Sequence, residues 1–413
     1  MWHRWSRFGI LGALILLLVV SGPSLGESAD CPEPDRIRAR VADNNEFAFS
    51  LYQKIAGAEP NLGKNAFFSP YSISTALGMT YAGARGETAQ QMSAALRFDA
   101  EQETLHQSFH DLATRLDGTG KPYQLKIANA LWGQRNYPFE AKFLSLIGEF
   151  YAGGFQTLDF SQAPEPSRVA INHWVERQTA DKIRNLLQQG EITSMTRLVL
   201  TNAIYFKGEW ETPFEKNQTH PAPFKVSPGN SVEVPMMVRT GQLPYTETDT
   251  LQAVELPYDG KDLAMVLLLP KDDLGSLEQN LSRQQVGILL TQLQPTRLSL
   301  FLPRFKFDAR YALQNKDYLP ALGMVAAFDS QKADFSGLTG HKGLYISGVF
   351  HKAFIDVNES GTEAAAVTAV VVGLKSMPPP ATVFRADHPF LFLIHHKPTG
   401  SILFMGRIAN PAQ

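Results

Sequence analysis

Hydrophobic side chains recur at helical spacing in the first half of the chain. The segment 47–55 is predicted to be an amphipathic helix because four apolar residues lie three or four positions apart: Phe47, Leu51, Tyr52 and Ile55. Ser69 before Pro70 indicates another helix start, since serine caps a first turn and proline fits the first helical position. Further helices are predicted at 72–82, 86–96, 139–151 and 171–182, with a strand at 125–131.

Strand-like patterns dominate the second half. Apart from Arg197 and Asn202, every residue of the run 197–206 is apolar, β-branched or aromatic, which predicts a central strand. Hairpin turns are predicted at 229–231 and 258–260. Other strands are predicted at 232–239, 251–257, 263–269, 297–305, 349–357 and in two apolar runs after Phe390. A helical first half followed by a strand-rich second half predicts an α+β fold with mixed sheets.

The stretch 358–380 does not suit an ordinary core strand. From Ala364 to Leu374 it is uncharged, and nearly all its side chains are small or β-branched. In a strand, one face would carry Thr362, Ala364, Ala366, Thr368, Val370, Val372 and Leu374. Lys375, Ser376 and the prolines 378–380 then favour an extended, protease-accessible loop tip. Two interpretations remain open: a buried strand before a surface loop, or a segment that is first an exposed loop and later a strand.

Composition indicates a folded, nearly neutral protein. The 413 residues are 44% hydrophobic and 19% charged, with a formal net charge of −2. These values are typical of globular proteins and exclude a bulk attraction to nucleic acid or to anionic membranes. We therefore expect neither nucleic acid nor membrane as a partner, and we expect a monomer.

The N-terminus is typical of a secretory signal. Basic residues up to Arg7 precede an apolar run at 10–20, and small residues follow up to Gly26. The run is shorter than the roughly 20 residues that span a bilayer. We predict a signal peptide at 1–26, an N-terminal extension at 27–42 and one domain at 43–413, secreted or, in a bacterium, periplasmic. Cys31 is the single cysteine, so an internal disulfide is impossible.

Common catalytic and metal-binding motifs are absent from the sequence. It contains no G-x-S-x-G, H-E-x-x-H or C-x-x-C pattern. His106 and His110 lie four residues apart on a predicted helix, but the glutamate of a metalloprotease motif is missing between them. We expect no metal, no cofactor and no enzymatic activity.

Eight stretches along 43–411 together resemble the serpin family. They occur in the family's order, and the combination is far more specific than any one stretch: Asn65–Ser72, Thr201–Trp210, Val234–Met237, Leu302–Phe305, His351–Ala353, Glu359–Ala366, Phe384–Phe390 and Phe404–Pro411. The resemblance implies three mixed or antiparallel sheets, about eight or nine helices and an exposed reactive-centre loop at about 359–380. It also implies a metastable inhibitor that a serine protease cleaves and that then traps this protease as a covalent acyl-enzyme by inserting the cleaved loop into the main sheet.

Residue roles follow from the same resemblance. The reactive bond would join Lys375 and Ser376, which predicts trypsin-like targets; a register one residue earlier would put Leu374 before the bond and predict chymotrypsin-like or subtilisin-like targets. The start of the loop is called the hinge, and it would comprise Glu359, Gly361, Thr362, Glu363, Ala364, Ala365 and Ala366. Buried polar groups beneath the sheet, the shutter, would be Ser69, Ser72, Asn202 and His351. The point where insertion begins, the breach, would include Trp210 and Arg304, with Arg304 placed to pair with Glu359.

Alternatives to inhibition remain. The chain also suits a non-inhibitory serpin-fold binding or carrier protein that proteases only cleave. An enzyme would require Ser69 or Ser72 to act as a nucleophile with His351, whereas the resemblance implies a structural network there. The segment 98–117 leans acidic, so we expect no heparin-type activation site.

Overall fold

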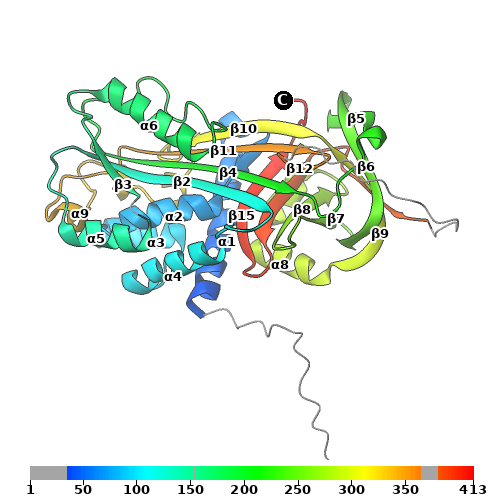
Figure 1. The fold of residues 1–413 in the computed structure, drawn as a ribbon, viewed down its shortest axis with the longest axis horizontal. Coiled ribbons are helices and arrows are strands. Elements are labelled where there is room, and N and C mark those ends of the chain that lie inside the picture. Colours follow the sequence, from blue (N-terminus) through cyan, green and yellow to red (C-terminus); the bar gives the residue numbers. More distant parts are fainter. Residues whose placement is uncertain (1–34, 153, 364–379) are drawn as a thin grey trace, which may run out of the picture. The chain divides into compact units, whose positions relative to one another are not determined.

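The computed structural model describes residues 35–152, 154–363 and 380–413, which form two β-sheets flanked by nine α-helices (Figure 1). The helices are α1 (Asp35–Gly57), α2 (Pro70–Tyr81), α3 (Gly86–Leu96), α4 (Gln102–Arg115), α5 (Ala141–Phe150), α6 (Pro164–Gln178), α7 (Leu274–Asn280), α8 (Arg283–Gln292) and α9 (Ser336–Thr339). Four 3₁₀ turns are η1 (Glu59–Asn61), η2 (Lys216–Gln218), η3 (Pro320–Leu322) and η4 (Ala326–Phe328). The predicted cap of α2 is confirmed, since the Ser69 side chain accepts a hydrogen bond from the backbone N–H of Ser72.

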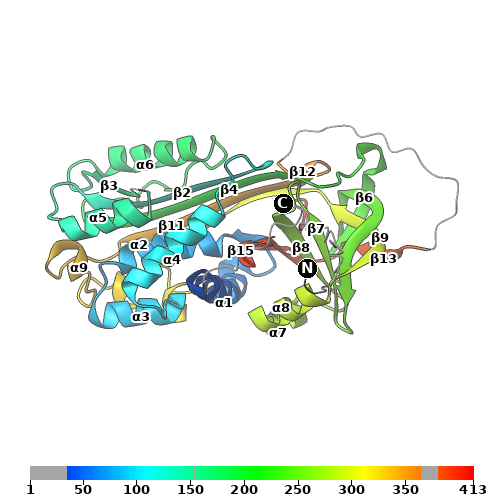
Figure 2. The ribbon, with the colours of Figure 1, turned by 60° about the horizontal axis from the view of Figure 1, so that its bottom comes forward.

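A six-stranded sheet lies between α6 on one face and α2 on the other (Figure 2). Its strands, in spatial order, are β10 (Phe305–Ala312), β11 (Gly348–Asn358), β12 (Gly361–Thr362), β4 (Leu198–Glu209), β2 (Tyr123–Gln134) and β3 (Phe155–Leu158). β4 is buried along almost its whole length, as its apolar sequence predicts for a central strand.

The second sheet has nine strands and two parts. Along one path it contains β1 (Ala66–Phe68), β15 (Ser401–Ile408), β14 (Phe390–His396), β8 (Leu263–Pro270), β7 (Leu251–Pro257), β6 (Asn230–Glu247), β9 (Gln294–Pro303) and β13 (Thr382–Arg385), and β5 (His220–Ser227) pairs with β6. β6 and β7 share only three residue pairs, at Tyr245–Glu247. With the six-stranded sheet, these two parts account for the three sheets that the resemblance implies.

Several element boundaries differ from the predictions; β6, for example, continues eight residues beyond the predicted end at 239. The strand predicted at 297–305 is two strands, because the chain leaves the nine-stranded sheet at Pro303 and enters the six-stranded sheet at Phe305. The helix predicted at 171–182 begins at Pro164 and ends at Gln178, after which Ala180 and Asp181 adopt positive φ angles of 50° and 60°. These left-handed conformations stop the helix, and the following residues pack on the sheet instead.

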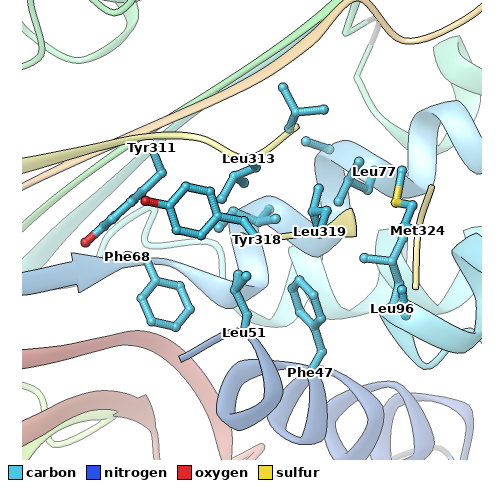
Figure 3. Close-up of a cluster of buried hydrophobic side chains, with 14 of the residues drawn as sticks. Phe47, Leu51, Phe68, Leu77, Leu96, Tyr311, Leu313, Tyr318, Leu319 and Met324 are labelled. Atoms are coloured by element: carbon cyan, nitrogen blue, oxygen red, sulfur yellow. The ribbon is translucent and has the colours of Figure 1, made fainter. Parts of the chain in front are cut away.

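The largest core cluster joins the helices to the six-stranded sheet. Figure 3 shows Phe47 and Leu51 of α1, Leu77 of α2 and Leu96 of α3 converging with Phe68 of β1. All five side chains are fully buried. The periodic apolar residues of 47–55 therefore do face the core, and α1 begins twelve residues before that segment and ends two residues after it.

Candidate functional site

A two-residue strand divides the end of the six-stranded sheet. In β12, Gly361 and Thr362 pair antiparallel with Asn358 and Val357 of β11 on one side. On the other side they pair antiparallel with β4, at Glu209 and Gly208. Beyond β12, β4 and β11 pair directly and in parallel, from Val199 and Gly348 to Tyr205 and Phe354. We call this direct pairing the seam; β12 occupies its open end (Figures 1 and 2).

Gly361 is required by the close approach of β4. Its φ is +152°, and a Cβ atom there would lie 2.1 Å from the carbonyl oxygen of Gly208. No side chain fits this position without moving backbone. At Glu363 the chain turns out of the sheet with φ 53°, while its N–H donates to the carbonyl of Asp356 at 2.7 Å. The start of the loop is thus locked into a single register.

Thr362 points into an aromatic pocket. The side chain is 1% exposed, and its hydroxyl lies 2.7 Å from the hydroxyl of Tyr258. The Tyr258 ring stacks on Trp210 with 4.6 Å between centroids. Burial raises the pKa of Tyr258, so this phenol stays neutral and forms an ordinary hydrogen bond with the Thr362 hydroxyl. A large or charged side chain at 362 has no room here.

The residues predicted for the breach meet the hinge directly. The Trp210 indole donates to the carbonyl of Asn358 at 3.0 Å, and its backbone N–H donates to Ser360 at 2.9 Å. Arg304 Nε donates to Glu359 Oε1 at 2.7 Å, and the Thr219 hydroxyl donates to the same oxygen at 2.5 Å.

Glu359 is better protected than an ordinary surface carboxylate. Its side chain is 3% exposed, although that of Arg304 is 42% exposed. Burial alone would raise the pKa of Glu359, but the hydrogen bonds from Arg304 and Thr219 outweigh it and hold the pKa below its usual range. The pair thus anchors the start of the hinge, and Thr219 is a contributor that the sequence did not reveal.

The four predicted shutter residues form one buried network. Ser69, Ser72, Asn202 and His351 are all 0% exposed. Asn202 Nδ2 donates to Ser72 Oγ at 2.5 Å, and Asn202 Oδ1 contacts the Nδ1 of His351. Asn202 and His351 are register partners across the seam, so the network joins β4, β11 and α2. Asn129 of β2, which the sequence did not indicate, accepts from Ser72 Oγ at 3.0 Å.

This network lacks the geometry of a hydrolase triad. His351 Nε2 accepts from the backbone N–H of Ser69 at 3.2 Å, and the Ser72 hydroxyl donates to Asn129. The imidazole therefore activates neither serine hydroxyl. Burial lowers the pKa of His351 to about 3, so the ring is neutral near physiological pH.

The segment 179–192 after α6 crosses the outer face of the seam, and we call it the strap. Its apolar side chains Ile183, Leu186 and Leu187 are fully buried against residues that include Val199 of β4 and Phe350 of β11. Lys352 of β11 donates to the strap carbonyl of Arg184 at 3.1 Å. The strap residue Lys182 forms an ion pair with Glu363 of the hinge. The sequence analysis predicted helix at 179–182 and made no prediction for 183–192, so it did not indicate the strap.

The two histidines considered as metal ligands, His106 and His110, have different surroundings. His106 is buried and its Nδ1 lies 2.7 Å from the Tyr151 hydroxyl, whereas His110 is exposed. No cluster of three or more His, Cys, Asp or Glu suited to a metal ion occurs among the described residues. Of the helices that the structure describes, none is long and apolar enough to cross a bilayer. The predicted positions Ala364, Ala365, Ala366, Lys375 and Ser376, like the signal at 1–26, lie outside the described residues.

Comparison with known proteins shows the family. The family model described as "Serpin (serine protease inhibitor)" matches residues 42–411. The leukocyte elastase inhibitor of Bos taurus is 43% identical over 381 residues, covering 90% of this chain and 99% of its own. Uncleaved ovalbumin aligns with a TM-score of 0.81 at 30% identity, covering 90% of this chain and 100% of its own. Human thyroxine-binding globulin with thyroxine gives 0.82 at 32% identity, covering 91% and 99%. The chain belongs to the serpin family.

We predict that the shutter makes folding stability dependent on acid. An unfolded histidine titrates near 6.5, whereas folded His351 resists protonation down to a pKa of about 3. The contribution of neutral His351 to the free energy of unfolding is complete above about pH 6.5 and is lost as the pH falls toward 3. In thermal unfolding between pH 7 and pH 4, the deficit of His351→Gln relative to the unmodified protein should shrink.

The matched control is His110→Gln, because His110 is exposed. Its difference from the unmodified protein should stay constant over the same pH range. A deficit for His351→Gln that is also constant with pH would contradict the prediction.

Proposed function

We propose that this protein is a suicide-substrate inhibitor of trypsin-like serine proteases. The observation that carries the proposal is β12, which already occupies the open end of the seam in the register of a longer strand. A strand added there would be antiparallel to both β4 and β11, whereas these two are parallel to each other. Insertion would replace one parallel pairing by two antiparallel pairings, which are slightly more stable per residue.

The register of β12 supports insertion of the small residues that follow. Thr362 is opposite Val357 and Gly208, so each second residue moves two positions along both neighbours. In an inserted strand, Ala364 would face Ile355 and Phe206. Thr368 would then lie between His351 and Asn202, the register partners of the shutter. A polar threonine at this point matches a polar network, and alanines match the apolar positions before it.

Trapping then follows from ordinary acyl-enzyme chemistry. The protease serine attacks the carbonyl carbon of Lys375, the bond to the nitrogen of Ser376 breaks, and an ester joins the two proteins. About thirteen inserted residues at roughly 3.3 Å each carry that ester about 40 Å. A dozen new hydrogen bonds at about 1 kcal/mol each release roughly 10 kcal/mol. Since catalytic groups tolerate about 0.5 Å of displacement, deacylation stops.

Target specificity rests on the residue before the reactive bond. Lys375 is complementary to a primary pocket with a carboxylate at its base, as in trypsin-like proteases. The bovine relative is called a leukocyte elastase inhibitor. If the reactive bond lay one residue earlier, Leu374 would suit a protease whose primary pocket is apolar. We favour Lys375 because the count from Glu359 in this sequence places it before the bond.

A non-inhibitory carrier is the second candidate, because the solved structures that match include thyroxine-binding globulin with thyroxine. A carrier would be clipped by trypsin without forming a complex. Mixing the protein with trypsin and running denaturing gels separates the two functions: an inhibitor gives a detergent-resistant band at the summed mass of the two proteins less the released fragment 376–413.

We also propose export through the segment 1–26. This proposal rests on the order of basic, apolar and small residues alone. N-terminal sequencing of protein recovered outside the expressing cell should begin after Gly26; protein retained in full length would contradict it.

We predict that Lys375→Ala reduces inhibition of trypsin on the order of 100-fold or more, because the pocket carboxylate loses its cationic partner. Mass spectrometry of the released C-terminal fragment should place its first residue at Ser376. The exposed Lys316→Ala is the matched control and should inhibit normally. A fragment that begins at Lys375 or Met377 would move the reactive bond.

We predict that Thr362→Arg converts the protein from inhibitor to substrate. The arginine cannot occupy the aromatic pocket at Tyr258, so insertion slows and deacylation competes. The stoichiometry of inhibition should rise several-fold, with clipped protein replacing complex on the gel. Thr119→Arg, at an exposed threonine, should leave the stoichiometry unchanged. An unchanged stoichiometry in Thr362→Arg would refute insertion at this position.

We predict that cleavage of the loop raises the unfolding temperature by at least about 10 °C, since the inserted strand adds roughly 10 kcal/mol. Calorimetry of intact protein, and of protein whose loop has been cut by a protease that it does not trap, measures the shift. Clipped Thr362→Arg is the control, because the same bond is broken while insertion is impaired. Equal unfolding temperatures for intact and clipped unmodified protein would show that no energy is stored.

A further inference from the structure

A cavity of about 520 Å³ opens between the turn that joins β6 to β7 and the helices α7 and α8. It lies at the far end of β7 from Tyr258, the residue that holds the hinge. The seven residues of β7 at roughly 3.3 Å each separate the two by about 23 Å. The inhibitory machinery described above therefore does not explain this cavity.

The floor of the cavity is apolar. Leu251 of β7, Leu281 and Leu289 are buried at 7%, 4% and 6% exposure, and Leu277 of α7 lies beside them. Ile288 of α8 also lines the cavity, yet it is 48% exposed. A large aliphatic side chain left half in water at a concave surface gains from an apolar ligand that covers it.

The charged groups of the lining are both acidic. Asp273 accepts from the backbone N–H of Ser276 at 2.9 Å and so is occupied in capping α7. Asp272 is exposed, and within the described parts of the chain it has neither a hydrogen bond nor an ion pair. No lysine, arginine or histidine is among the described residues that line the cavity. The lining therefore offers one free carboxylate above an apolar floor.

We propose that this cavity binds a small amphipathic cation, with an aromatic or alicyclic body on the leucine floor and a protonated amine at Asp272. The volume falls within the roughly 300–1,000 Å³ of small-molecule sites. An anionic ligand of the same shape would meet only carboxylates and is disfavoured. The lining thus favours a ligand with a positive charge near Asp272 and an apolar body on the leucine floor.

The test uses two fluorescent probes that share one ring system and differ in charge. The cation 9-(aminomethyl)anthracene should bind the full-length protein saturably, one to one, with a dissociation constant on the order of 10–100 μM. The anion 9-anthracenecarboxylate should bind at least about tenfold more weakly. Equal or tighter binding of the anion, or no saturable binding of the cation, would overturn the proposal.

Two variants locate the binding site. Asp272→Asn should weaken the cation about fivefold and leave the anion unchanged or slightly improved, because one partly exposed ion pair is lost. Glu103→Gln is the matched control, since it removes an exposed carboxylate of α4 that does not line the cavity. If both variants bind the cation like the unmodified protein, Asp272 is not its partner and the proposal is wrong.

Ile288→Arg places a bulky cation over the floor and should abolish binding of the cationic probe. Val325→Arg is its control, because Val325 is also 48% exposed and lies outside the lining. Thermal unfolding of each variant checks that the fold is intact. Trypsin inhibition by these variants should match the unmodified protein, which keeps this test separate from that of the proposed function. Cation binding retained by Ile288→Arg would exclude this cavity as the site.

Discussion

The parallel pairing of β4 with β11 is the constraint on which the rest of this structure depends. Every other strand pair of the six-stranded sheet but β2 with β3 is antiparallel, so the seam is where two parallel strands lie side by side at the sheet's centre. β12 shows that an antiparallel strand fits between them, because it pairs with both at the open end. The sheet therefore holds two residues of a strand between β4 and β11, and beyond these two residues β4 and β11 pair directly with each other.

Polar contacts close the seam along its length. At its open end, Arg304 and Thr219 hold Glu359, and Tyr258 holds Thr362. In its middle, His351 and Asn202 join β11 to β4. Each such bond contributes only about 1 kcal/mol net, yet a buried group left without its partner costs more. These contacts join β4 and β11 along the whole length of the seam.

The strap adds a second layer over the same seam. Its buried side chains rest on β4 and β11, and the ion pair of Lys182 with Glu363 connects it to the hinge. Part of that ion pair is open to water, with Lys182 43% exposed, so its contribution is small. The ion pair joins the hinge to the segment that packs over the seam.

Local chemistry in the sequence predicted much of the fold correctly. The cap at Ser69, the helix start at Gly86 and the strand Leu251–Pro257 each depend on neighbouring residues, so their prediction needed no tertiary information. The end of α6 and the division between β9 and β10 were missed, because each is decided by packing against a distant strand. Asn129 and Thr219 were missed for a related reason: a lone polar residue carries no pattern, and its partners lie far away in the chain.

By itself, the sequence determined the α+β class and the small-residue stretch after Gly361, since composition and periodicity are properties of the chain alone; the family followed from the resemblance of eight ordered stretches. Only the tertiary structure decided that Gly361 and Thr362 already lie between β4 and β11, and that Lys182 contacts Glu363. The contacts with β4 and with Lys182 join residues more than a hundred positions apart. They exist because the sheet and the strap bring distant backbone segments to hydrogen-bonding distance, and no local pattern encodes that distance.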